Sequence, residues 1–178
     1  MNRRRFLMTS AQLALGMVLS AAPIECFANR IDYHPLSFYH THTGENLQIK
    51  YSPKIGCSFA TQRKVNEFLR DFRTEQVHSI DPKLLEILSQ IQIFSGSTGT
   101  YEIISGYRSP ETNHLLRERS SGVAPNSLHM QGKAIDIRLS DVPTRKIQRI
   151  AIMLRRGGVG YYADSDFVHI DTGDFRTW

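Results

Sequence analysis

The sequence contains few cysteines, a single tryptophan and no long uninterrupted hydrophobic run. Its 178 residues include two cysteines, too few for a small domain held together by disulfides. The most apolar stretch, residues 11–22, is interrupted by Gln12, Gly16 and Ser20, so it is too short and too polar to be a membrane span. No internal repeat is present, and 40% hydrophobic with 22% charged residues excludes a disordered tail. This composition predicts one globular domain.

The charge is moderately basic and does not by itself identify a partner. The formal net charge is +5, from 22 lysines and arginines against 17 acidic residues. The basic residues lie on predicted helix faces among acidic ones, without the aromatic and basic platform that binds nucleic acid. We therefore expect no nucleic-acid partner, although a mild positive charge is compatible with an anionic polymer.

The N-terminal residues resemble an export signal. Residues 3–7, Arg-Arg-Arg-Phe-Leu, match the Arg-Arg-x-Phe-Leu order of twin-arginine signals, which are read by a receptor. An ordinary secretory signal is the alternative, and both predict export without a membrane span after processing. Small residues predict cleavage near Ala28, which gives a signal over 1–28 and one domain over 29–178. Processing removes Cys26, leaves Cys57 as the only cysteine, and lowers the formal charge to +3 because the signal carries three arginines and one glutamate.

Hydrophobic periodicity predicts a single α+β domain with an antiparallel sheet and flanking helices. A hairpin is expected from Phe38–His42 and Leu47–Tyr51 around Thr43-Gly44-Glu45. Apolar spacing and capping residues predict four helices: one through residues 65–72, one from Pro82 to a stop at Gly96, one from Pro110 to about Arg119, and one from Pro143 to a stop at Gly157-Gly158. Further strands are expected over residues 101–104, 134–139 and 167–171.

Two of these strands each place a polar side chain opposite an apolar face. Aliphatic residues alternate along 134–139 and share one face, so Asp136 points to the other. The same alternation along 167–171 presents His169 opposite the core. If the two strands pair antiparallel, Asp136 and His169 stand side by side on the second face of the sheet.

A third polar side chain can join this pair. His129 lies seven residues before Asp136, and Gln131-Gly132 allows the chain to bend back over the strand. Two imidazoles and one carboxylate are typical of catalytic zinc sites, because three protein ligands leave the fourth tetrahedral position for water. A zinc-bound water whose pKa falls to about 7 is a nucleophile at neutral pH. On spacing alone, these three residues are only modest evidence for a zinc site.

Residues 127–136, Ser-Leu-His-Met-Gln-Gly-Lys-Ala-Ile-Asp, resemble the S-x-H-x-x-G-x-A-x-D signature of the M15-type zinc peptidases that cut peptidoglycan stems. Residues 167–171 resemble the strand that carries the last metal ligand of those enzymes. Residues 105–109, 157–162 and 171–173 are similar to the subgroup once called domain of unknown function 882. The resemblance runs through essentially all of 29–178. It implies a Hedgehog- and DD-peptidase-like fold and a periplasmic Zn²⁺ enzyme that hydrolyses peptide crosslinks in peptidoglycan.

The resemblance also implies roles for individual residues. At matching positions, His129, Asp136 and His169 would bind zinc, and Arg108 would stabilise the oxyanion of the tetrahedral intermediate. Ser109 and Asn113 would contact substrate or support the site. Ser109 also suits a helix cap.

The general base departs from the family pattern. M15 enzymes often carry a glutamate three residues before the last histidine ligand, or a histidine two before it, where this chain has Asp166 and Phe167. Asp166 is a carboxylate at the right offset that either reaches the water or lies in a surface turn. Asp171, two residues after His169 on the same strand face, is the other candidate, either as base or as the group that orients His169.

Two other functions stay open on the sequence. A D,D-carboxypeptidase or dipeptidase of the same fold would trim uncrosslinked stems. A noncatalytic zinc-stabilised module that binds the wall is favoured by the missing glutamate. Trp178 and Tyr161-Tyr162 are interpreted either as edges of a groove or as packing anchors.

Overall fold

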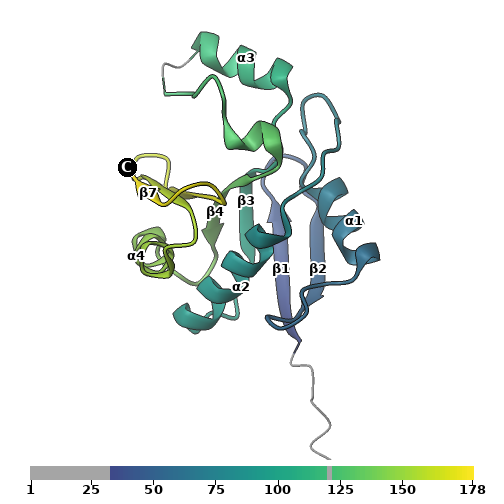
Figure 1. Ribbon diagram of the computed structural model, residues 1–178, viewed down its shortest axis with the longest axis vertical. Coiled ribbons are helices and arrows are strands. Elements are labelled where there is room, and N and C mark those ends of the chain that lie inside the picture. Colours follow the sequence, from purple (N-terminus) through teal and green to yellow (C-terminus); the bar gives the residue numbers. More distant parts are fainter. Residues whose placement is uncertain (1–32, 120–121) are drawn as a thin grey trace, which may run out of the picture. The chain divides into compact units, whose positions relative to one another are not determined.

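The computed structural model describes residues 33–119 and 122–178. The predicted signal over 1–28 lies outside the described residues. A seven-stranded sheet in the order β2-β1-β3-β4-β6-β5-β7 forms the centre of the fold (Figure 1). Its strands are β1 His34–His40, β2 Asn46–Tyr51, β3 Tyr101–Ser105, β4 Ala134–Leu139, β5 Gly158–Tyr162, β6 Phe167–Asp171 and β7 Arg176–Thr177. The helices are α1 Phe59–Phe68, α2 Pro82–Ser95, α3 Pro110–Arg119, α4 Thr144–Leu154 and the 3-10 helix η1 Leu128–Gln131.

The predicted α+β class is confirmed, but the sheet is mixed instead of purely antiparallel. Among the described strands, β1 with β2, β3 with β4, β4 with β6 and β5 with β6 pair antiparallel. The pairs β1 with β3 and β5 with β7 are parallel. The first parallel pair arises because α1 and α2 carry the chain back across the sheet before β3 begins, and such a crossover is what parallel neighbours need.

Local capping chemistry confirms the predicted boundaries of α2, whereas the first helix was predicted too late: α1 ends at Phe68 instead of continuing to residue 72, and it begins at Phe59 because Ser58 caps it. The Asp81 side chain accepts a hydrogen bond from the Lys83 N–H, and Pro82 occupies the first turn of α2, where a missing N–H costs nothing. Gly96 ends the helix in the left-handed conformation, φ 69°. At α3, the Ser109 Oγ accepts from the Thr112 N–H, so Ser109 takes the capping role that the sequence suggested.

The hydrophobic core lies between the helices and one face of the sheet. Alternate residues of β4 and β6, among them Ile135, Ile137 and Val168, are fully buried on that face. Helices α2 and α4 contact each other, and α4 also contacts β4, β5 and β6. Cys57 is half-buried and packs against the core edge, as expected for an unreactive thiol. Within the described residues, no helix is both long and apolar enough to cross a membrane.

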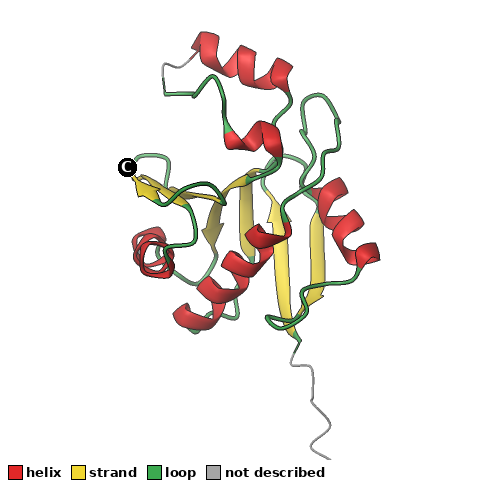
Figure 2. Ribbon diagram, viewed as in Figure 1, coloured by secondary structure: helices red, strands yellow, loops and turns green. Residues whose placement is uncertain are grey.

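Helices α3 and η1 lie at one end of the sheet, next to the ends of the strands that carry Asp136 and His169. Figure 2 shows α3 and η1 beyond the ends of the central strands, away from α2 and α4. A register shift in β3 between Ile103 and Ser105 places Ser105 opposite Asp136 of β4. Gly132 ends η1 with φ 63°, and a Cβ there would collide with the Ser79 carbonyl oxygen. A glycine at 132 is therefore required for η1 to turn directly into β4.

Candidate metal centre

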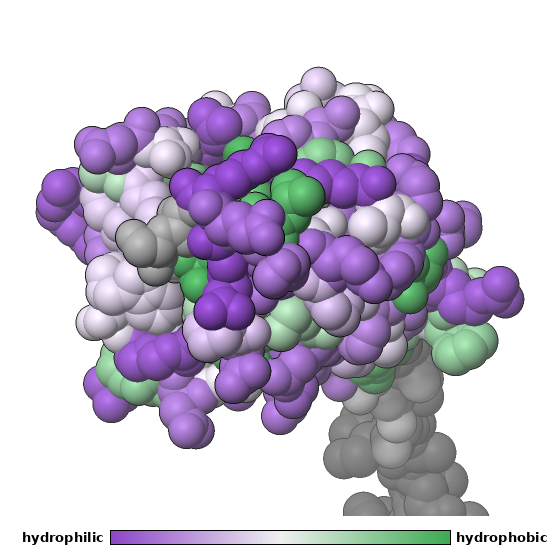
Figure 3. Space-filling view, turned by 90° about the horizontal axis from the view of Figure 1, so that it is seen from above, coloured by the Kyte–Doolittle hydropathy of each residue, from purple (hydrophilic) through white to green (hydrophobic). Residues whose placement is uncertain are grey.

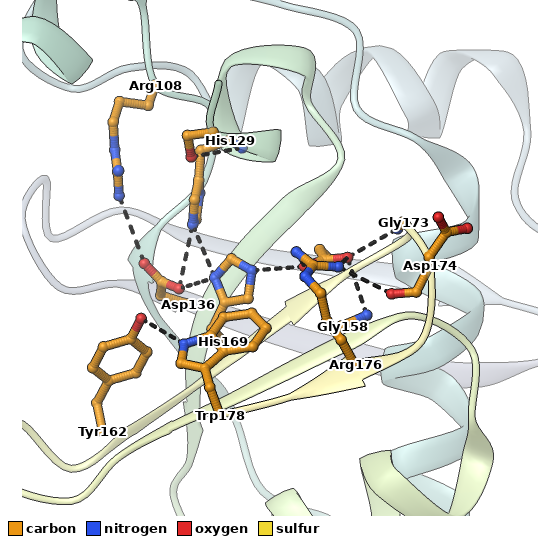
Figure 4. A network of polar contacts seen from close by, with 12 residues as sticks. Arg108, His129, Asp136, Gly158, Tyr162, His169, Gly173, Asp174, Arg176 and Trp178 are labelled. Atoms are coloured by element: carbon orange, nitrogen blue, oxygen red, sulfur yellow. Dashed lines mark hydrogen bonds and ion pairs between the residues drawn. The ribbon is translucent and has the colours of Figure 1, made fainter. Parts of the chain in front are cut away.

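Three side chains from separate elements converge at this end of the sheet. His129 comes from η1, Asp136 from β4 and His169 from β6. Strands β4 and β6 pair antiparallel with Asp136 directly opposite His169, which confirms the predicted neighbours. The three residues are buried, and their ligand atoms lie within 4.8 Å of one another. Figure 4 shows the two imidazoles and the carboxylate pointing toward one another.

Hydrogen bonds outside the cluster hold the far ring nitrogen of both histidines. The His129 Nδ1 lies 2.8 Å from the Gly106 carbonyl oxygen. A carbonyl only accepts, so Nδ1 carries the proton and Nε2 turns its lone pair toward the cluster. The His169 Nε2 lies 3.0 Å from Asp171 Oδ2, which leaves Nδ1 facing Asp136. In both rings, a hydrogen bond on the far nitrogen leaves the other nitrogen facing the cluster, which is the arrangement that metal-binding histidines have.

The separations between the ligand atoms match those of a tetrahedral metal site. The His169 Nδ1 is 2.9 Å from Asp136 Oδ1 and 3.2 Å from His129 Nε2, and the latter is 3.3 Å from Asp136 Oδ1. A tetrahedral ion with ligand bonds of about 2.0–2.1 Å holds its ligands roughly 3.3 Å apart. The three residues present therefore fit a small divalent cation.

The electrostatics of the cluster favour positive charge at its centre. Burial lowers the pKa of His169, but hydrogen bonds to Asp136 and Asp171 outweigh it and raise that pKa to about 9. Burial likewise opposes ionisation of Asp136, yet His129 and His169 beside it hold the pKa of its carboxyl well below the usual range. A carboxylate that stays ionised while buried is a suitable ligand for a cation.

Asp171 lies behind His169 and is itself held from several sides. It is fully buried, and its Oδ1 accepts from the backbone N–H groups of Gly158 and Gly173 at 3.0 and 2.9 Å. The Arg176 guanidinium adds a two-pronged contact at 3.1 and 2.7 Å. Sequence reasoning missed Arg176. The sequence shows only an arginine five residues after Asp171, beyond a glycine, and this pattern is too common to indicate an ion pair.

Arg108 reaches the cluster from the opposite side. Its Nη2 lies 3.8 Å from Asp136 Oδ2 and 3.4 Å from Ser105 Oγ, and its backbone N–H donates to the His129 carbonyl oxygen at 3.2 Å. Burial lowers the pKa of the guanidinium, and the charge of Asp136 acts in the opposite direction. The Arg108 side chain is only 13% exposed, and a cation that is shielded from water and only partly paired can stabilise negative charge developing beside it.

The cluster forms the floor of a cleft of about 430 Å³. One wall is the segment 122–128, with Val123, Ala124 and Leu128, and the other carries Tyr162 and Trp178. Figure 3 looks onto this end of the molecule, where hydrophilic residues predominate and smaller hydrophobic areas lie between them. A cleft with a polar floor and partly apolar walls is typical of ligand-binding sites.

The remaining predicted residues lie outside the lining of this cleft. Ser109 is fully buried at the start of α3. Asn113 is buried, and its Nδ2 donates to the carbonyl oxygen of Ala124, so it supports the wall segment from behind. Asp166 is exposed in the turn between β5 and β6, where its Oδ1 accepts from Thr144 Oγ1 at 2.5 Å and borders a separate pocket.

Comparison with known proteins gives one consistent result. Residues 29–178 match the sequence model of the family Peptidase_M15_2, described as peptidoglycan L,D-endopeptidase MepK. The probable peptidoglycan L,D-endopeptidase MepK of Haemophilus influenzae is 41% identical over 178 residues, which cover 99% of this chain and 95% of that protein. The peptidoglycan L,D-endopeptidase MepK of Escherichia coli K12 is 39% identical over 179 residues, covering 99% of this chain and 97% of that protein.

Proposed function

Since the chain belongs to the Peptidase_M15_2 family, we propose that it is a zinc-dependent endopeptidase that hydrolyses peptide crosslinks of peptidoglycan. The relatives' names point to the L,D class of bond, which joins an L-centre to a D-centre. The observation that carries the proposal is the buried His129, Asp136 and His169 cluster, whose ligand atoms lie at tetrahedral separations.

His129 Nε2, Asp136 Oδ1 and His169 Nδ1 would hold the zinc ion. When bound, the ion would lower the pKa of water at its open position to about 7 and polarise the scissile carbonyl. Asp171 orients His169 through its Nε2–H, and Gly106 does the same for His129 through its carbonyl oxygen. These two contacts keep both rings in place without any contribution from the substrate.

Arg108 would act on the substrate. Its guanidinium already stands beside the cluster, so the carbonyl oxygen of the scissile amide can lie between them as it gains negative charge. A donor fixed in advance stabilises the transition state more than the ground state and therefore raises kcat. Burial of the guanidinium strengthens this effect, because less water competes for the charge.

Replacing Asp166 tests whether this carboxylate acts as the general base of the reaction. An asparagine at 166 would keep the acceptor for Thr144 and tolerate the positive φ of 48°, while removing the basic carboxylate. Since Asp166 borders a different pocket, we expect Asp166→Asn to keep kcat/KM within about twofold of the wild type. Steady-state cleavage of crosslinked muropeptides measures this. A hundredfold loss with unchanged stability would instead identify Asp166 as the general base.

We also propose that the protein works in the periplasm. The twin-arginine pattern at residues 3–7 supports export through the twin-arginine machinery, and the substrate class is found in the cell wall. Replacing the two paired arginines of this pattern, Arg3 and Arg4, with lysine and following the protein in cell fractions separates this route from ordinary secretion.

The function is tested on a panel of purified muropeptides: L,D-crosslinked dimers, D,D-crosslinked dimers and uncrosslinked stems. We expect the mature protein with zinc to split the L,D-crosslinked dimers, and a chelator to stop the reaction until zinc is restored. Trimming of uncrosslinked stems alone would point to the carboxypeptidase or dipeptidase alternative. Zinc and wall binding without turnover on any substrate would favour the noncatalytic module.

A further inference from the structure

The cleft offers few titratable groups that can exchange a hydrogen bond with the reacting amide. Among the described residues that line it, the titratable ones are the three proposed zinc ligands, Arg108, Arg176 and Tyr162. Arg176 is already engaged by Asp171. Tyr162 is therefore the one titratable lining group that is neither a guanidinium nor a proposed ligand. Neither Asp166 nor Asp171 lines the cleft.

Tyr162 is held in a defined orientation at the end of β5. Its ring stacks on that of Phe167, its partner across the β5–β6 pair, with centroids 4.5 Å apart and planes 14° apart. Trp178 Nε1 donates to the Tyr162 hydroxyl oxygen at 3.0 Å. An indole N–H only donates, so the hydroxyl accepts in this bond and keeps its own hydrogen for another partner.

The described residues supply no acceptor for that hydrogen. The Tyr162 side chain is 37% exposed, and its hydroxyl has no second hydrogen bond within residues 33–119 and 122–178. Figure 4 shows the phenol extending toward Asp136, with Arg108 approaching the same carboxylate from the other side. Burial lowers the pKa of Arg108, and Asp136 and Tyr162 both act on its guanidinium in the opposite direction, so Tyr162 lies within electrostatic range of it.

Trp178 connects Tyr162 to the cluster. Its indole lies 5.3 Å from the His169 ring, centre to centre. It rests on Gly160, where a Cβ would come within 2.6 Å of the indole, so a glycine is needed for this close approach. Backbone hydrogen bonds from Trp178 N–H to Val159 and from Tyr161 N–H to Trp178 hold the indole on β5.

We propose that Tyr162 is a catalytic hydrogen-bond donor: its hydroxyl donates to the oxygen of the scissile carbonyl as that oxygen gains negative charge, and Trp178 positions it. The assignment rests on the proposed endopeptidase function. Tyr162 and Arg108 then act from opposite sides of the reacting amide, one as a neutral donor and one as a cation. Trp178 is a positioning residue, because it acts through Tyr162.

The test compares Tyr162→Phe with Tyr161→Phe on L,D-crosslinked dimers. Tyr161 is the adjacent residue on the same strand, is half-buried, packs against the core and has no hydrogen bond from its hydroxyl within the described residues. We expect Tyr162→Phe to lower kcat about ten- to a hundredfold with KM within twofold, and Tyr161→Phe to match the wild type. Trp178→Phe, which removes only the donor to Tyr162 while keeping an aromatic ring, should give a smaller loss of kcat.

Two further measurements separate a catalytic role from a structural one. Zinc content and melting temperature should be unchanged in Tyr162→Phe. A phosphinate that mimics the tetrahedral state should bind this variant about tenfold more weakly in calorimetry, while the reaction products bind equally well. Wild-type kcat in Tyr162→Phe, or a rise in KM alone, would overturn the assignment of Tyr162. Lack of cleavage by the wild-type protein would overturn the proposed function itself.

Discussion

Replacing His169 with alanine is expected to abolish the cleavage of crosslinked muropeptides and the retention of zinc together. The variant keeps two of the three proposed ligands, His129 and Asp136, and leaves a space where the third ring stood. Two protein ligands rarely hold zinc against water, so we expect activity to fall by about a thousandfold or more. Turnover of dimers and metal content of the purified protein are the measurements.

An exposed histidine provides the matched control. Among the described residues, His114 on α3 pairs only with Glu118, and its side chain is 74% exposed, so His114→Ala should keep both zinc and activity. Circular dichroism establishes that the His169 variant is folded. If His169→Ala retained more than a tenth of wild-type activity with zinc bound, the ligand set would be wrong.

Replacing Asp171 with asparagine is expected to produce the second largest effect, on both stability and metal affinity. The carboxylate accepts from two backbone N–H groups, from Arg176 and from His169, whereas an amide offers only one oxygen and turns an NH₂ toward the remaining donors. Unmet donors in a fully buried position should lower the free energy of unfolding by about 3 kcal/mol. Loss of the contact that orients His169 should weaken zinc binding about 10- to 100-fold.

Urea unfolding and zinc competition titrations measure the two effects, with Asp174→Asn, an exposed carboxylate of the same loop, as control.

The pH dependence of stability at acid pH gives a second test of Asp171. Burial raises the pKa of Asp171, but its contacts with His169 and Arg176 outweigh this and hold it below the ordinary value of 3.8. The stability from Asp171 is thus present above that value and lost as the pH falls through the lower folded pKa, so the variant should lose this part of the acid dependence. An unchanged unfolding curve would contradict the assigned network.

The pairing of Asp136 with His169 was predictable from sequence because short alternating strands permit few arrangements. In β4 and β6 the aliphatic residues must face the core, which leaves one orientation for Asp136 and His169. A shift of one residue in register would bury one of these polar groups among aliphatic side chains. The caps of α2 were predictable for a similar reason, because Asp81-Pro82 and Gly96 act through local hydrogen bonds and backbone angles.

The order and direction of the strands were not predictable in the same way. The parallel pairing of β1 with β3 depends on how two helices cross the sheet, which no local pattern encodes. The sequence does not predict strand β5, because Gly158 and Gly160 weaken its strand propensity and Gly157-Gly158 instead indicates a helix end. That helix ends earlier, at Leu154, with Arg155 in the left-handed conformation, φ 52°.

Sequence offset alone could not place Asp166 either. Counting back three residues from His169 assumes that the chain is extended, but Asp166 sits at φ 48° in a turn and bonds to Thr144 of α4. Asp171 lies on the same strand face as His169, as predicted, and its complete burial supports the orienting role over that of a base.

Because of its position, Trp178 is also an intrinsic fluorescent probe of the cluster and the cleft. The chain contains one tryptophan, so its fluorescence on selective excitation comes from a single indole between His169 and Tyr162. The emission of an indole responds to nearby charge and to its hydrogen bond. Loading of the cluster and occupation of the cleft can therefore be followed by emission intensity and wavelength, in real time and without an attached dye.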